Sequence, residues 1–246
     1  MISYLKAENL KFKRTFSRKF IFWAPVFLAI FAYIVFSKKT EAQRSYSTNI
    51  YNCWSLFFVT LGGMLFCMFS VLKDKKTYLL LISRGIDTKI SWISKILIVT
   101  FYLLISHIWL FALFEITNYF IFRSFFDIYN FFYATILNFL VSISLVPLNL
   151  FLEYKTSTLV TFAINLIGLM AGTELSPTFI WFASPWGYAL RFMCPILGIH
   201  PNGEFLEPNS YLLDKSVLIP GIVLCMFIFT IGTYITVILI DNKEGE

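Results

Sequence analysis

Few side chains in this sequence have the type and spacing that chemistry requires. His107 is the only histidine within a long apolar run, and no acidic residue inside an apolar run lies in register with it. We therefore expect a packed histidine and not a proton relay. Glu115 and Glu174 fall at the ends of apolar runs, where they either line an exit path or simply meet the membrane surface. The four cysteines, which show no metal-binding spacing, are Cys53, Cys67, Cys194 and Cys225.

The motifs of nucleotide hydrolysis and common hydrolytic chemistry are absent. The sequence contains no GxxxxGK[ST] phosphate loop, no HExxH and no GxSxG. We therefore predict no catalytic residues, no metal site and no cofactor on this chain, which is not expected to be an enzyme. An intramembrane enzyme would need clustered polar groups at membrane depth, and the apolar runs contain none.

The elements that position these residues are set by hydropathy. Hydrophobic residues make up 58% of the 246 positions and charged residues only 14%, against about 25% charged in ordinary soluble domains. Continuous apolar runs of this length predict membrane-spanning helices and exclude barrel strands. The sequence predicts an all-α integral membrane protein whose six spans are Phe20–Phe36, Ile50–Leu72, Trp92–Phe114, Tyr129–Leu152, Thr158–Thr173 and Val217–Ile240.

A basic leader, residues 1–19, precedes the spanning domain, residues 20–246. Its apolar residues Leu5, Phe12, Phe16 and Phe20 recur at intervals of seven and four, with basic residues between them. This pattern predicts an amphipathic helix over 3–19 that lies on the membrane with its apolar stripe toward lipid.

Lysine and arginine placement predicts the orientation. The segments predicted to lie on the same side of the membrane as the N-terminus hold 14 of the 20 basic residues. The segments on the opposite side hold 6. The positive-inside rule then places both termini in the cytoplasm of a multi-pass bacterial cell membrane protein. The net charge of +6 is accordingly attributed to membrane flanks, and no nucleic-acid partner is expected.

Two connections and two interruptions differ from a plain bundle. The sequence of residues 73–85 predicts a short helix on the cytoplasmic loop. This helix either docks a soluble partner or lies at the membrane interface without one. The segment from Glu174 to Lys215 is aromatic and broken by prolines, which predicts short re-entrant or interfacial helices that cap the outer mouth of the bundle. Pro147 is expected to kink the fourth span, and Gly62-Gly63 to mark close helix approach.

Together these features resemble ABC-2-type permeases. Two stretches narrow the resemblance: the leader Lys6-Ala7-Glu8-Asn9-Leu10-Lys11-Phe12-Lys13-Arg14, and Ser184-Pro185-Trp186-Gly187-Tyr188 with Arg191 and then Ile199-His200-Pro201-Asn202-Gly203. Both are similar to permease subunits of lantibiotic-immunity ABC transporters of Gram-positive bacteria.

The resemblance implies partners and two functional regions. It implies a separate cytoplasmic ATPase in two copies that binds ATP and Mg, a second permease that is homologous or identical, contact with membrane lipid, and a lantibiotic or similar peptide as the exported substrate. The residues that would couple to the ATPase are Lys75, Lys76, Tyr78, Leu81, Ile82 and Arg84. Those that would shape the extracellular gate are Trp181, Pro185, Trp186, Arg191, Pro195, His200, Pro201, Asn202 and Gly203.

Two other functions stay open at this point. A stand-alone secondary carrier or channel would work without an ATPase and would want ionisable groups within its spans, where few occur. A membrane sensor subunit would not transport at all.

Overall fold

The computed structural model describes residues 1–36, 41–83 and 87–241, and for residues 73, 75–83 and 241 it describes the backbone only. Within these residues it has six segments long and apolar enough to cross a membrane. They are α2 (Ser17–Phe36), the continuous α3 (Ala42–Cys53), η1 (Trp54–Gly62) and α4 (Gly63–Ser83), α5 (Thr88–Phe122), α6 (Ile128–Ser144) with α7 (Val146–Lys155), α8 (Thr158–Leu175), and α10 (Leu218–Asp241). The predicted all-α membrane fold is confirmed.

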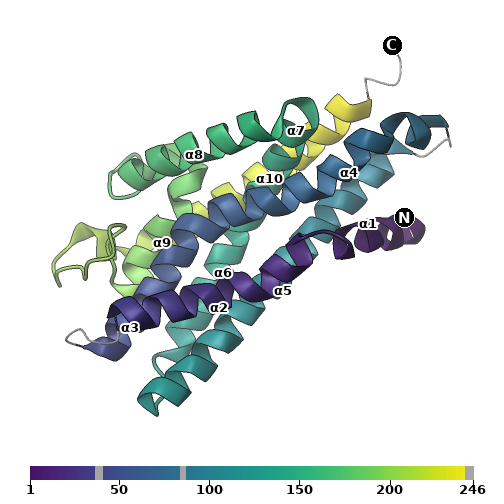
Figure 1. Cartoon of the computed structure of the whole chain (residues 1–246). Helices are drawn as coiled ribbons and strands as arrows, with labels where there is room; N and C mark the ends of the chain where they lie inside the picture. The colour runs from purple at the N-terminus through teal and green to yellow at the C-terminus, as the bar shows by residue number, and fades with distance from the viewer. Residues whose placement is uncertain (37–40, 84–86, 242–246) are drawn as a thin grey trace.

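The helices form one bundle with α1 (Ile2–Lys13) and the end of α10 at the same end of the molecule (Figure 1). A hydrogen bond of 3.2 Å from Trp92 Nε1 to Thr236 Oγ1 joins the first turns of α5 to the last turns of α10. We call this the α1 end. The opposite end holds the segment between α8 and α10, residues 176–217, which we call the cap, and we call that end the cap end. Large apolar side chains are exposed along α2, α5, α6, α8 and α10, which is the surface that lipid would cover.

The second span is longer than predicted. The residues at both junctions, Cys53 and Gly63, have right-handed helical dihedrals, so α3, the π-helix η1 and α4 form one uninterrupted helix. At about 1.5 Å per residue it is roughly 60 Å long, twice the thickness of the hydrocarbon layer. A separate short helix was predicted over 73–85. The predicted start is wrong, because α4 begins at Gly63 and continues through this segment to Ser83.

The leader is helical but does not lie as predicted. Helix α1 ends at Lys13, and α2 begins at Ser17 after a short turn. Phe12 was expected to face lipid, yet it is 1% exposed and stacks on Tyr102 at 4.3 Å between ring centroids. Phe16 is exposed. Polar pairing of α1 with the bundle, described below, turns Phe12 inward.

The fourth span is interrupted where Pro147 predicted. Helix α6 ends at Ser144, and Pro147 occupies the first turn of α7, where its missing N–H costs little. The prediction for Gly62-Gly63 was wrong: a Cβ on Gly62 would meet Phe58 of the same continuous helix, and one on Gly63 would meet nothing within 4 Å.

The segment before the last span folds back into the bundle. Short 3-10 turns at Trp181–Ala183 and Pro185–Gly187 lead into α9 (Tyr188–Leu197), all of whose residues are buried. Further turns at Tyr211–Leu213 and Lys215–Val217 lead into α10. Met193 Sδ lies 3.9 Å from Nδ2 of Asn138, ten residues into α6, a depth of about 15 Å. The sequence predicted either a re-entrant or an interfacial helix here, and the buried position of α9 is that of a re-entrant helix.

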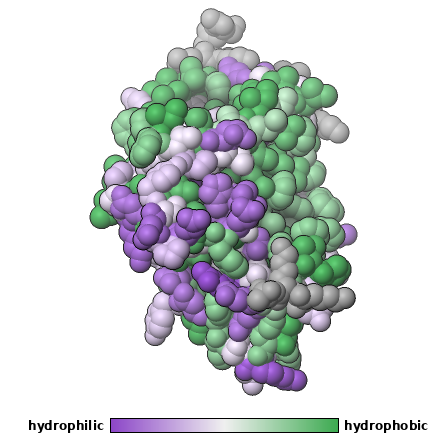
Figure 2. Space-filling view, turned by 90° about the vertical axis from the view of Figure 1, so that its left-hand side faces the viewer, coloured by the Kyte–Doolittle hydropathy of each residue, from purple (hydrophilic) through white to green (hydrophobic). Residues whose placement is uncertain are grey.

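The cap end is polar where it would meet water. Figure 2 shows hydrophilic residues gathered over the middle of this end and apolar residues around them. This surface includes the turn after α9, where His200, Asn202 and Glu204 hydrogen-bond with one another through side chains and backbone.

Candidate functional site

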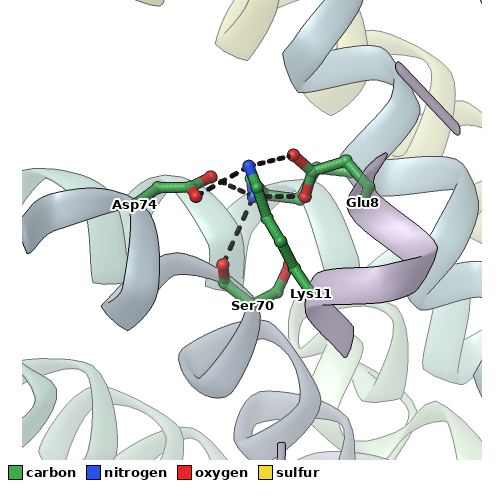
Figure 3. A network of polar contacts seen from close by, with 5 residues as sticks. Glu8, Lys11, Ser70 and Asp74 are labelled. Carbon is green, nitrogen blue, oxygen red and sulfur yellow. Dashed lines mark hydrogen bonds and ion pairs between the residues drawn. The ribbon is translucent and has the colours of Figure 1, made fainter. Parts of the chain in front are cut away.

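A cluster of four charged residues joins α1, α4 and α5 (Figure 3); Glu8 and Lys95 are buried, and Lys11 and Asp74 are partly buried. Lys95 Nζ lies 2.8 Å from Glu8 Oε2 and 2.5 Å from Asp74 Oδ2. Lys11 Nζ lies 2.6 Å from Glu8 Oε1 and 2.8 Å from Asp74 Oδ1. The two ammonium groups and two carboxylates alternate, and the backbone oxygen of Ser70 accepts a further bond of 3.3 Å from Lys95.

The cluster is electrostatically balanced. Burial raises the pKa of the Asp74 carboxyl, but Lys95 and Lys11 outweigh burial and hold this pKa below its ordinary value of 3.8. Burial lowers the pKa of the Lys11 ammonium, but Glu8 and Asp74 outweigh it and raise this pKa above 10.5. Asp74 and Lys11 therefore stay charged near neutral pH, and the ion pairs of the cluster hold α1 against the bundle.

Asp74 also lies where the predicted ATPase-coupling residues begin. Lys75, Lys76, Tyr78, Leu81 and Ile82 follow it on the same helix, but their side chains lie outside the described part of the chain, as does the whole of Arg84. Their role as a docking surface stays a prediction.

Sequence reasoning missed the charge cluster. Glu8 and Lys95 are 87 residues apart, and Lys11 and Asp74 are 63 apart. The one local signal was an acid in a basic leader, Glu8, three residues before Lys11, a spacing that brings side chains together on a helix.

At the cap end the predicted gate residues fall into two groups. The first group, Trp181 to Pro195, packs within the bundle around α9. Trp186 Nε1 donates to Asn165 Oδ1 at 3.1 Å, and Asn165 Nδ2 donates to Asn149 Oδ1 at 2.7 Å. The Trp181 ring meets the Tyr188 ring edge-on at 5.6 Å. Pro185 begins a 3-10 turn, and Pro195 lies buried within α9.

Arg191 belongs to the first group and is 3% exposed. Its Nη1 donates to the backbone oxygen of Leu212 at 2.8 Å. This bond ties α9 to the turn that leads into α10. A buried guanidinium that lost this acceptor would be costly. The bond therefore holds α9 to that turn.

The second group forms a turn against α3. His200 Nδ1 accepts from the Asn202 amide at 3.3 Å, and the Pro201 carbonyl accepts from Asn52 Nδ2 at 3.2 Å. Gly203 has a φ of 92°, and a Cβ there would lie 3.0 Å from Asn49 Oδ1. Only glycine suits a position that combines this φ with so close a neighbour.

Of the residues singled out for possible chemistry, His107 takes a structural position. His107 is fully buried, with Nδ1 2.8 Å from the Leu103 carbonyl and Nε2 3.3 Å from Ser142 Oγ, among three aromatic rings. This is the packed histidine we expected. Glu174 is exposed. Both carboxylate oxygens of Glu115 are covered and without a hydrogen-bond partner among the described residues. All four cysteines are free.

No protein-family model matches this chain, and neither a curated protein nor a solved structure shows significant similarity to it. The comparisons assign no family. Within the described residues, no group of three or more His, Cys, Asp or Glu side chains could hold a metal ion.

Proposed function

We propose that this chain is the permease subunit of an ATP-driven exporter that removes a lantibiotic or similar membrane-active peptide from a bacterial membrane. One observation supports this most: a single helix, α3–η1–α4, contacts both candidate regions. Near one end Asn52 binds the Pro201 carbonyl, and near the other Asp74 enters the charge cluster.

A continuous helix of this kind can transmit displacement. In this proposal, nucleotide-driven closure of a partner ATPase moves residues 75–83, and α4 carries the movement through η1 to the turn at 200–203. The charge cluster keeps α1 and α5 moving with α4. The cap then changes between two arrangements whose balance the nucleotide biases.

The π-helix supports the same proposal. Such segments are rare and occur often at functional positions. Here it lies between the two candidate regions, where a change between π and α geometry would shift the cap relative to α4. Both termini are placed in the cytoplasm, from the distribution of basic residues.

The docking assignment is tested by Tyr78→Asp combined with Leu81→Asp. Charged residues in the centre of an apolar docking surface should abolish co-purification of the vanadate-sensitive ATPase and protection against the peptide, with membrane insertion intact. The matched control is Leu10→Asp, which changes an exposed leucine of α1 at the same end. Unchanged ATPase co-purification in the double variant would refute the assignment.

A further inference from the structure

An apolar groove of about 540 Å³ runs along the side of the bundle between α2 and the helix α3–η1–α4. One wall includes Phe20, Trp23 and Phe27, and the other includes Trp54 and Phe57. Trp23 and Phe27 are 68% and 74% exposed and form the rim. We call this the α2–η1 groove; it opens onto the lateral face that lipid would cover.

The floor of the groove is a stack of aromatic rings. Trp54 lies on Phe58 with 3.7 Å between ring centroids, and Phe58 lies against Phe20 at 5.7 Å. A Cβ on Gly62 would meet the Phe58 ring at 2.7 Å. The absent side chain lets this ring lie back against its own helix, which keeps the groove open.

The length of the groove matches one leaflet. Its lining on α2 runs from Phe20 to Phe31, about 16 Å of helix, and half of the hydrocarbon layer is about 15 Å thick. A single acyl chain, which spans about this thickness, could therefore lie along the groove. An extended peptide would find only two indole N–H groups and one thiol in the lining, too few to pair with its backbone.

Positive charge lies at one end of the groove. Arg18 and Lys19 immediately precede Phe20, and both are exposed. The nearby acids Glu8 and Asp74 are already paired with Lys11 and Lys95. Helix geometry places both side chains off the groove face of α2, and their length lets them turn toward an anionic headgroup at this level.

We propose that the α2–η1 groove binds one acyl chain of an anionic phospholipid from the leaflet at the α1 end, with its phosphate held by Arg18 and Lys19. The bound chain would lie on the stacked rings of η1 and so contact the π-helix directly. This inference does not depend on the proposed transport function.

The acyl-chain site is tested with Ala24→Trp and, separately, Leu28→Trp, both of which fill the groove. The full chain is delipidated, titrated with phosphatidylglycerol or phosphatidylcholine, and examined by native mass spectrometry. Each variant should retain phosphatidylglycerol at least ten-fold more weakly than the wild type. The control, Ile167→Trp, adds the same ring to an exposed position on α8 and should behave as the wild type.

Two results would overturn the acyl-chain site. One is unchanged retention of phosphatidylglycerol in both groove variants. The other is loss of a second copy of the chain from the complex without loss of lipid, which would make the groove a contact between copies.

The headgroup site is tested with Arg18→Gln combined with Lys19→Gln. This pair should remove the preference for phosphatidylglycerol over phosphatidylcholine and leave retention of phosphatidylcholine unchanged. The control pair, Lys6→Gln with Lys13→Gln, removes two exposed charges from α1 and should keep the preference. An unchanged preference in the Arg18 and Lys19 variant would overturn the headgroup assignment.

Discussion

Among single residues, Lys95 is a buried charge whose contacts join α1, α4 and α5. It is 3% exposed and lies between the carboxylates of Glu8 and Asp74. Replacing two buried opposite charges can be nearly neutral, but removing one of them leaves its partner uncompensated. We therefore interpret the cluster as a means of fixing the position of α1 and α4, and not as a source of net stability.

Lys95→Met should destabilise the protein by about 3 kcal/mol, because two carboxylates then share a buried space. Thermal unfolding in detergent would measure this, with the exposed Lys6→Met as control. Adding Glu8→Gln to Lys95→Met should recover part of the loss. Equal stability of the Lys95 and Lys6 variants would show that the cluster is not formed.

The cluster should also give α1 a defined pH range. The pKa of Asp74 is lowered, so its contribution is present above its unfolded value of about 4 and is lost as the pH falls through the lower folded value. The pKa of Lys11 is raised above 10.5, so its contribution is present below about 10.5 and is lost at higher pH. Hydrogen exchange of α1 should be constant, after correction for intrinsic rates, from about pH 5 to pH 9. A change in protection near pH 7 would contradict this assignment.

This cluster also shows the limit of sequence reasoning for single residues. From the sequence, Lys95 counts only as one of the basic flanks and Asp74 only as part of the segment 73–85, because their partners on α1 lie more than sixty residues away. Local spacing identifies pairs within one helix, and only tertiary packing brings Glu8 to Lys95. The gate residues between Trp181 and Gly203 were named from the resemblance, and their role stays a prediction.

At the level of elements, the re-entrant cap is fixed by a backbone contact. A Cβ on Gly172 would lie 2.6 Å from the Gly187 amide nitrogen, so α8 and the turn before α9 meet without side chains between them. Sequence reasoning placed close approach at Gly62-Gly63 instead, because glycines that pack helices cannot be told from glycines that accommodate a ring of their own helix.

Gly172→Ala should separate α8 from the turn at Pro185–Gly187 and cost about 2 kcal/mol by overpacking. The matched control is Gly63→Ala, where a Cβ meets nothing within 4 Å and alanine should slightly favour the helix. Thermal unfolding of both variants would measure the difference. Comparable stability would contradict the backbone contact.

Trp186→Phe tests whether the cap does more than hold the fold together. The substitution removes the bond from Trp186 Nε1 to Asn165 Oδ1 and keeps an aromatic ring against Gly168. We expect assembly with the ATPase to persist and protection of cells against the peptide to fall several-fold. Full protection would remove this hydrogen bond from the transport mechanism.

For the whole molecule, hydropathy was sufficient to predict the class of fold and the number of spans. It did not predict that α3, η1 and α4 form one helix, because the polar residues after Leu72 read equally well as a loop or as a helix that leaves the membrane. The proposed function rests on the resemblance of the leader and of the segment 184–203, together with a continuous helix that contacts both regions.

The proposed function requires that the chain moves its substrate only together with a partner ATPase. Reconstitution into liposomes, with and without that ATPase, tests it most directly by following a fluorescent lantibiotic out of the membrane. We expect ATP-dependent release only when the ATPase is present, and none with the Tyr78→Asp and Leu81→Asp variant. Release by the chain alone, without nucleotide, would contradict the claim.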